Sequence, residues 1–278
     1  WLSSYGGGLY SYQPGETRLK AMPAQPKLLA EGLVTDFWFG NDGSVWVSSY
    51  DQGLWLFSPA SAQWQQFKAN PMVPAQLQSN NLTGLLMDMQ GTLWLKSPAG
   101  LYALSAMAQK VRFLPSDPSN PKLLAHNDVF AITPAANGKF WLANRDGGAA
   151  LFDPFTASVQ RYPIQVDTGL KLKPTLARQV LQTPDGIIWL GTDVGLFQLD
   201  LQSGLWRPYA LTKEPQQMNV GVLYLDGLNQ LWVGTRGDGL FLLKSGNIQH
   251  FKQDPASDTG LGSNTIATLQ ADEYNDLW

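Results

Sequence analysis

The chain has 278 residues, of which 44% are hydrophobic and only 15% are charged, and its formal net charge is −3 at pH 7. The slight negative charge and the lack of a Lys/Arg cluster argue against a nucleic-acid partner. The absence of cysteine excludes disulfides and thiolate chemistry, and it is compatible with the bacterial periplasm. No apolar run is long enough to span a bilayer, so we expect the chain itself not to be embedded in a membrane.

The strongest signal is a repeat of about 46 residues that is marked by a tryptophan. Spacings of 43 to 48 residues separate the seven tryptophans of the repeat: Trp1, Trp46, Trp94, Trp141, Trp189, Trp232 and Trp278. Three residues before the tryptophan stands Gly or Asn, which tolerate positive φ and therefore predict a tight turn. A second glycine follows six or seven residues after it, and an aromatic residue closes a short strand about 20 residues after it in five copies.

The pattern predicts four short strands per repeat. The first copy supplies its second, third and fourth strands at residues 1–4, 9–12 and about 17–21. Apolar first strands of later copies are predicted at residues 82–88, 129–133, 180–183 and 220–226. The last copy supplies a first strand at residues 265–271 and the turn into a second strand at 275–278. Frequent glycine and proline exclude a helical solenoid of similar period.

Four antiparallel strands in a repeat of this length are the period of a β-propeller blade. We therefore predict an all-β propeller of four-stranded antiparallel blades, with about six repeats in a single domain over residues 1–278. Both ends fall inside a repeat, so we interpret the chain as a fragment of a larger protein. It either closes with six blades, one of them built from both termini, or belongs to a propeller of seven or more blades. Stacked blades bury aromatic strands between them, which predicts a core role for the motif tryptophans and for Trp38, Trp55, Trp64 and Trp206.

The repeat resembles a known family. Its clearest copies read Pro-Asp-Gly-Ile-Ile-Trp-Leu-Gly-Thr-Asp-Val-Gly-Leu-Phe at residues 184–197 and Leu-Trp-Val-Gly-Thr-Arg-Gly-Asp-Gly-Leu-Phe at residues 231–241. Together with the asparagine-containing stretches at 79–82, 126–129 and 261–266, they resemble the two-component regulator propeller repeat. The resemblance covers essentially the whole chain. It implies an extracytoplasmic or periplasmic sensor domain of a membrane-anchored hybrid histidine kinase or diguanylate cyclase, of a kind that usually signals as a homodimer.

The sequence predicts no catalytic residue, no metal and no cofactor. It holds only two histidines, His126 and His250, and His250 is expected on a solvated outer strand. Phosphate-binding loops, zinc-binding helices and nucleophile elbows are missing from it. The scattered carboxylates occur mostly in turns, where they commonly accept backbone hydrogen bonds.

Comparison of the copies indicates two loops whose residues vary within a fixed frame. In a propeller, the loop after the second strand and the loop before the first strand are expected on one face, around the mouth of the central channel. The candidate ligand-binding residues from the two loops are Tyr5, Tyr50, Asn81, His126, Asn127, Arg145, Arg178, Asp193, Asn219, Arg236 and Asn264. Their hydrogen-bonding and aromatic groups suit a small polar ligand, of which a carbohydrate is one candidate, or a protein partner.

Three functions remain open at this point. The first is ligand sensing or interaction by a bacterial membrane-bound signalling protein. The second is a protein-interaction scaffold that takes no small ligand. The third is a propeller lyase or hydrolase, which would need a histidine with an acidic or metal partner near the channel, and only His126 is placed for that.

Overall fold

The structure is a computed structural model that describes residues 2–4, 7–12, 18–22, 24–73, 76–105, 110–145, 148–164, 174–212, 217–244, 246–254, 260–272 and 276–278. The chain forms two compact units. Unit 1 comprises residues 1–116 and 127–129, and unit 2 comprises residues 117–126 and 130–278. Among the helices of the described ranges, none has the length and apolar character that crossing a membrane requires.

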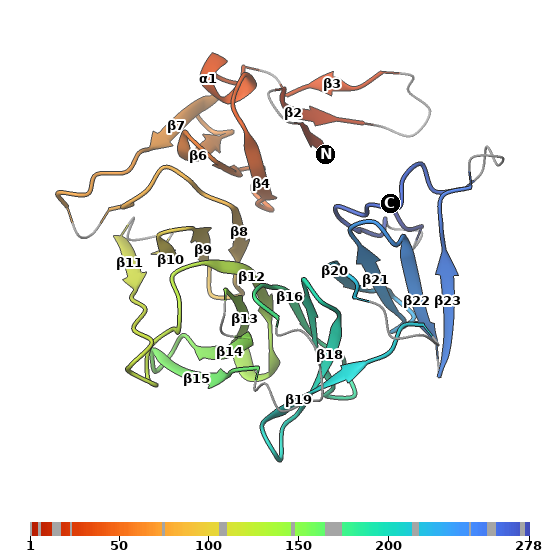
Figure 1. The fold of residues 1–278 in the computed structure, drawn as a ribbon. Coiled ribbons are helices and arrows are strands. Elements are labelled where there is room, and N and C mark those ends of the chain that lie inside the picture. The colour runs from red at the N-terminus through yellow and green to blue at the C-terminus, as the bar shows by residue number, and fades with distance from the viewer. Residues whose placement is uncertain are drawn as a thin grey trace. The chain divides into compact units, whose positions relative to one another are not determined.

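Unit 1 holds three antiparallel sheets, which we number blades 1 to 3 (Figure 1). Blade 1 has three strands, β1 (Leu2–Ser4), β2 (Gly8–Ser11) and β3 (Lys20–Ala21), and is followed by the short helix α1 (Lys27–Ala30). Blade 2 consists of β4 (Val34–Phe39), β5 (Val45–Ser49), β6 (Gly53–Ser58) and β7 (Gln63–Phe67). Blade 3 consists of β8 (Gly84–Met87), β9 (Thr92–Ser97), β10 (Gly100–Ser105) and β11 (Lys110–Leu114).

Unit 2 holds the remaining sheets, blades 4 to 6, each with four antiparallel strands. Blade 4 consists of β12 (Val129–Pro134), which begins at the unit boundary, β13 (Phe140–Asn144), β14 (Gly148–Asp153) and β15 (Ser158–Tyr162), with the 3₁₀ turn η1 (Ala136–Gly138). Blade 5 consists of β16 (Ala177–Gln182), β17 (Ile188–Thr192), β18 (Leu196–Asp200) and β19 (Leu205–Tyr209). Blade 6 consists of β20 (Val220–Leu225), β21 (Leu231–Thr235), β22 (Leu240–Lys244) and β23 (Asn247–Phe251).

The predicted blade pattern and its turns are confirmed. The residue three places before the motif tryptophan has positive φ in five copies: Gly43, Gly91, Gly138, Gly186 and Asn229. The second glycine of the repeat is needed for space as well as for conformation. Gly53 has φ of 76°, and a Cβ built on it would lie 2.5 Å from the carbonyl oxygen of Phe67. The first strand of blade 5 begins earlier than predicted, at Ala177, because its start pairs with Thr192 across a bulge.

In three copies an aspartate of the turn also forms a hydrogen bond with the indole of the motif tryptophan. Asp88 accepts the indole N–H of Trp94 at 2.9 Å, and Asp226 accepts that of Trp232 at 2.9 Å. Asp272 does the same for Trp278 at 3.0 Å. In each pair the aspartate stands six residues before the tryptophan, so one side chain closes the turn and orients the aromatic ring.

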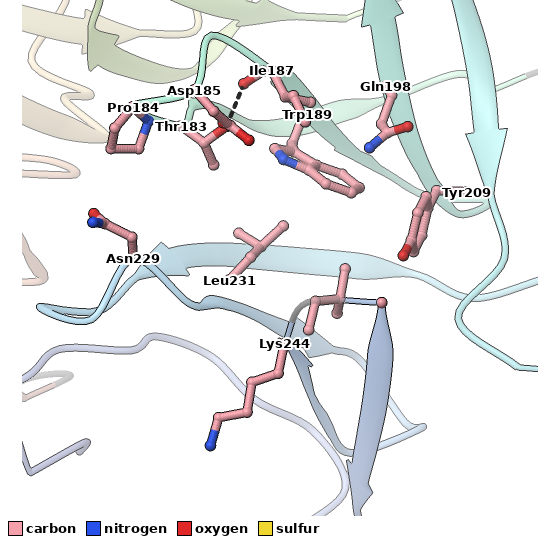
Figure 2. Close-up of a pocket in the computed structure, with 12 residues that line it drawn as sticks. Thr183, Pro184, Asp185, Ile187, Trp189, Gln198, Tyr209, Asn229, Leu231 and Lys244 are labelled. Atoms are coloured by element: carbon pink, nitrogen blue, oxygen red, sulfur yellow. Dashed lines mark hydrogen bonds between the residues drawn. The ribbon is translucent and has the colours of Figure 1, made fainter.

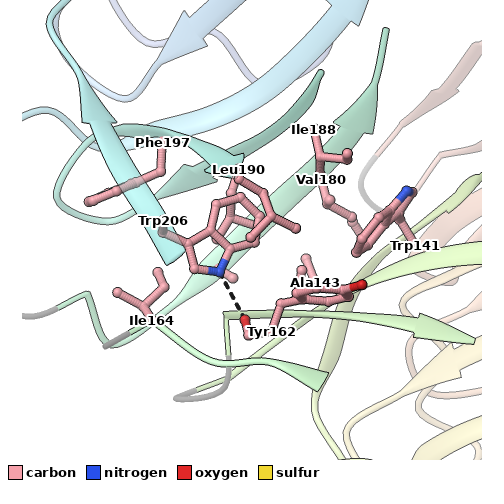
Figure 3. Packing of buried hydrophobic residues seen from close by; sticks show 13 residues of the cluster. Trp141, Ala143, Tyr162, Ile164, Val180, Ile188, Leu190, Phe197 and Trp206 are labelled. Carbon is pink, nitrogen blue, oxygen red and sulfur yellow. Dashed lines mark hydrogen bonds between the residues drawn. The ribbon is translucent and has the colours of Figure 1, made fainter. Parts of the chain in front are cut away.

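Aromatic and aliphatic side chains fill the space between neighbouring blades of one unit. Figure 3 shows this for blades 4 and 5, where Trp141, Val180, Leu190 and Trp206 pack together. The indole N–H of Trp206 donates to the carbonyl oxygen of Tyr162 at 2.9 Å, so burial of this ring leaves its polar atom bonded.

The predicted burial of the motif tryptophans is confirmed in four copies, Trp46, Trp94, Trp141 and Trp189, and Trp55 and Trp206 are buried as well. Trp38, Trp64 and Trp232 are half-buried. The prediction is wrong for Trp278, which is 75% exposed. Its hairpin pairs with itself, through the backbones of Gln270 and Trp278 and the bridge between Ala271 and Leu277. Trp1 lies outside the described residues.

The predicted first strand at residues 265–271 is present only as bridges, from Thr265 to Arg236 and from Ala271 to Leu277. The backbone N–H of Ile266 donates to the carbonyl oxygen of Thr235 at 2.8 Å, which places this segment beside blade 6 in unit 2. Closure of the ring, the number of blades and the single-domain organisation stay predictions.

Candidate functional site

The candidate site begins with a bulge near the start of a first strand. In β4, β16 and β20 the pairing register shifts between Val34 and Asp36, between Ala177 and Gln179, and between Val220 and Val222. The extra residue in each bulge is therefore Thr35, Arg178 or Gly221. A bulge leaves one residue out of the ladder and re-aims its side chain, so this position is free to point away from the packed sheets.

Arg178 uses this position to reach the neighbouring blade. Its Nε donates to Oδ1 of Asn219 at 2.8 Å, and the carbonyl oxygen of Asn219 accepts the backbone N–H of Arg236 at 2.8 Å. Arg236 lies over the bulge of its own blade, because a Cβ built on Gly221 would be 3.4 Å from its Nε. We call Arg178, Asn219 and Arg236, together with Asp193, the arginine cluster of unit 2.

The electrostatics of the cluster are dominated by its two guanidinium groups. Burial and, to a smaller degree, the charge of Arg236 lower the pKa of the Arg178 guanidinium, whereas Asp193 raises it. The Asp193 carboxylate, after β17, is turned to the segment before β16, where it accepts the hydroxyl of Thr175 at 2.6 Å and the backbone N–H of Leu176 at 3.2 Å. Within the described residues neither arginine forms an ion pair with a carboxylate, so the two positive charges are only partly balanced.

Arg145 occupies the same place in blade 4 as Arg236 does in blade 6. Its Cζ lies 6.0 Å from the ring centroid of Phe130, which follows Val129 at the start of β12. The backbones of Arg145 and Leu176 form a bridge, as those of Arg236 and Thr265 do. The loop after each second strand therefore abuts the start of the next repeat, which brings the two predicted sets of loop residues together within unit 2.

The predicted residues of unit 1 lie in loops of that unit. Tyr50 is exposed in the turn after β5, and its N–H donates to the carbonyl oxygen of Leu33 at 2.9 Å. Asn81 donates its N–H to Oγ of Ser79 at 3.1 Å. Oδ1 of Asn127 accepts the hydroxyl of Ser116 at 2.6 Å. His126, in unit 2, is half-buried. Tyr5 lies outside the described residues.

Asn264 joins two backbone segments of its blade by hydrogen bonds. Its Oδ1 accepts the backbone N–H of Gln253 at 2.7 Å, and its carbonyl oxygen accepts that of Gly239 at 2.8 Å. Asn80 makes the same two bonds in the third repeat, to Ala69 at 2.7 Å and to Gly53 at 3.0 Å. The Ser-Asn dipeptides at 79–80 and 263–264 are the sequence signal for this role. The sequence prediction gave Asn264 a ligand-binding role and did not include Asn80.

Structural comparison finds propellers of bacterial signalling proteins. The extracellular domain of the one-component system BT4673 from B. thetaiotaomicron matches with a TM-score of 0.73 and 17% identity, over 98% of this chain and 34% of that one. The extracellular domain of the hybrid two-component system BT3049 from B. thetaiotaomicron matches with a TM-score of 0.71 and 18% identity, over 97% and 34%. A catalytically inactive virginiamycin B lyase from Staphylococcus aureus, with quinupristin, matches with a TM-score of 0.63 and 13% identity, over 89% and 77%.

These likenesses establish the fold: the chain is a β-propeller built of antiparallel blades, as predicted. The first two neighbours are extracellular domains of the kind of signalling protein that the repeat resemblance implies. The chain spans about a third of their length. No protein-family model and no curated protein sequence matches it.

Proposed function

We propose that this chain is the ligand-sensing propeller in the extracytoplasmic part of a bacterial membrane-bound signalling protein. We further propose that its arginine cluster binds an anionic group of the ligand. The sensor role is supported by the repeat pattern and by the propeller neighbours, which are extracellular domains of signalling proteins.

The anionic ligand is supported by one observation: within the described residues, Arg178 and Arg236 form no ion pair with a carboxylate. Only Nε of Arg178 has a protein acceptor among the described residues, so its two Nη atoms and the whole guanidinium of Arg236 remain available. Guanidinium groups bind carboxylate, sulfate and phosphate through paired hydrogen bonds. Asn219 fixes the orientation of Arg178, which reduces the ordering cost of binding.

The test is calorimetric titration with glucuronate, sulfate and phosphate, and with glucose as the uncharged comparison. We expect at least one anion to bind saturably, and its affinity to fall about tenfold or more in Arg178→Gln and in Arg236→Gln. Added salt should weaken binding because the interaction is electrostatic. Arg207→Gln is the matched control, since Arg207 is an exposed arginine of the same unit that pairs with Asp200 at 3.0 Å. Binding that is unchanged in both cluster variants would contradict the proposal.

Catalysis is not part of the proposal. His250 is stacked on the ring of Phe241, with 3.9 Å between ring centroids, and its Nε2 lies 2.7 Å from the carbonyl oxygen of Asp238. A scaffold that takes no small ligand remains the alternative. It predicts that none of the anions binds saturably, while a protein partner binds in an Arg178-dependent manner.

A further inference from the structure

A second candidate site lies between blades 5 and 6, away from the arginine cluster. It is a groove of about 440 Å³ beside the turns that join first and second strands. Figure 2 shows Thr183, Trp189, Gln198 and Tyr209 on the blade 5 side and Asn229, Leu231 and Lys244 on the blade 6 side. All of these residues belong to unit 2.

Blade 5 lacks the aspartate that binds the motif tryptophan in blades 3 and 6, as do blades 2 and 4, which have Gly40 and Ala135 at this place. Thr183 stands six residues before Trp189, in the place of Asp88 and Asp226 in blades 3 and 6. Its hydroxyl donates to the carbonyl oxygen of Ile187 at 3.0 Å. It does not accept a hydrogen bond from the Trp189 indole as the aspartates do from theirs. Throughout the described ranges, Nε1 of Trp189 donates to no protein atom.

Trp189 is largely buried, with 6% of its surface exposed, and that surface borders the groove. The tryptophan lines the groove, and its ring is held edge-on against that of Tyr209, with 4.9 Å between centroids. A donor in this position is fixed in direction before any ligand arrives.

The other lining groups define the chemistry that would complement this donor. The amides of Gln198 and Asn229 form no hydrogen bond among the described residues, and each can both donate and accept. Leu231 and Leu243 supply an apolar surface. Asp185 and Lys244 are the charged residues of the lining and have opposite signs, so its formal net charge is zero. A neutral ring with hydroxyl groups on its edge and C–H groups on its face matches this combination.

We propose that this groove is a second binding site, which takes a neutral saccharide and bonds one of its oxygens to Nε1 of Trp189. A groove of this volume lies within the range of small-ligand pockets. The proposal is independent of the arginine cluster, because the two sites lie at opposite ends of β16 and β17 and differ in charge.

Thr183→Asp is the decisive variant, because it restores the residue found in blades 3 and 6. Thr183 already makes the backbone bonds of that turn, accepting from Gly186 at 2.8 Å and donating to Ile187 at 2.9 Å, so aspartate fits the local fold. Its carboxylate should bind the Trp189 indole and compete with the ligand. Thr183→Ser, which keeps the hydroxyl, is the matched control.

The experiment follows the ¹⁵N-indole resonance of Trp189, assigned with Trp189→Phe, during titration with a panel of neutral disaccharides of glucose, galactose, mannose, xylose and N-acetylglucosamine. We expect at least one disaccharide to shift this resonance saturably in the natural chain, in Thr183→Ser and in Arg236→Gln. In Thr183→Asp we expect at least a tenfold loss of affinity. The proposal is overturned if no disaccharide moves the resonance, or if Thr183→Asp binds like the natural chain.

Discussion

The carboxylate of Asp36 in β4 and the ammonium group of Lys96 in β9 both lie against Gly84, the first residue of β8. A Cβ built on Gly84 would be 2.8 Å from Nζ of Lys96 and 3.3 Å from Oδ2 of Asp36. Oδ2 also accepts the backbone N–H of Leu85 at 3.0 Å. Burial raises the pKa of Asp36, although the bond from Leu85 and the charge of Lys96 oppose this, and burial lowers the pKa of Lys96. Opposite charges thus join blades 2 and 3 inside unit 1.

Removal of one charge should cost more than removal of both. We expect Lys96→Met to lower the free energy of unfolding by about 2–3 kcal/mol, less than for a fully buried pair because both residues are half-buried. The Asp36→Asn/Lys96→Met variant should be within about 1 kcal/mol of the natural chain or more stable. Urea denaturation of the two variants and of Asp36→Asn completes the cycle, and additive losses would show that the charges do not interact.

The Lys96→Met variant should also show a pH dependence with a defined sign. Lys96 lowers the pKa of Asp36, so its loss raises the folded-state pKa of that carboxyl further above 3.8. Between 3.8 and the raised pKa, the folded state binds more protons than the unfolded state, so stability falls as pH rises through this window. Denaturation midpoints at pH 4 and pH 7 measure the effect, with the Asp36→Asn/Lys96→Met variant as the control that should lack it.

Trp206 is expected to be the more costly of two tryptophans to remove. Trp206→Ala should lose about 3–5 kcal/mol, because the ring is fully buried between blades 4 and 5. Trp206→Phe should lose about 1–2 kcal/mol through the missing bond to Tyr162. Trp278→Ala, at an exposed ring, should stay within about 1 kcal/mol of the natural chain. A loss below about 1 kcal/mol in Trp206→Ala would show that the inter-blade core does not depend on this ring.

Asn264 should affect stability without affecting anion binding. Asn264→Ala leaves the N–H of Gln253 without its acceptor and should cost about 1 kcal/mol, whereas Asn264→Asp keeps an acceptor and should recover most of it. Thermal denaturation measures both variants, and calorimetry with the anion that binds the natural chain should give an unchanged affinity. A large loss of affinity in a variant that is still fully folded would instead show that Asn264 contacts the ligand.

Arg161 organises residues 117–124 ahead of β12. Its guanidinium donates to five backbone carbonyls of this segment, those of Asp117, Pro118, Asn120, Leu123 and Leu124. Lysine has no planar fork with which to bind several carbonyls at once, so Arg161→Lys should be nearly as unstable as Arg161→Ala, with a loss of at least about 2 kcal/mol. Hydrogen exchange should rise selectively in this segment. Recovery of protection by lysine would show that charge alone suffices.

Local patterns were sufficient to predict the blades. Glycine or asparagine before each tryptophan, and the glycine after it, are backbone requirements that can be recognised without knowledge of the tertiary structure. The candidate site depended on features with no local signature. The bulge at Arg178 sets the direction of its side chain, and Asp36 meets Lys96 only because two blades stack. The threonine that replaces aspartate before Trp189 was visible in the sequence, but its meaning required the indole hydrogen bonds of the other blades.

The bulges in β4, β16 and β20 place one residue of each strand outside the regular pairing. Thr35, Arg178 and Gly221 hold the same place in three blades, and the pairing resumes in the same way after each of them. A residue at this position lies outside the ladder, so the alternation of side chains along the strand does not fix its direction. The three blades carry a hydroxyl, a guanidinium and no side chain at this position within the same tryptophan–glycine frame. If this position contacts the ligand, as we propose for Arg178, a propeller of this construction can change its specificity one blade at a time while its fold stays the same.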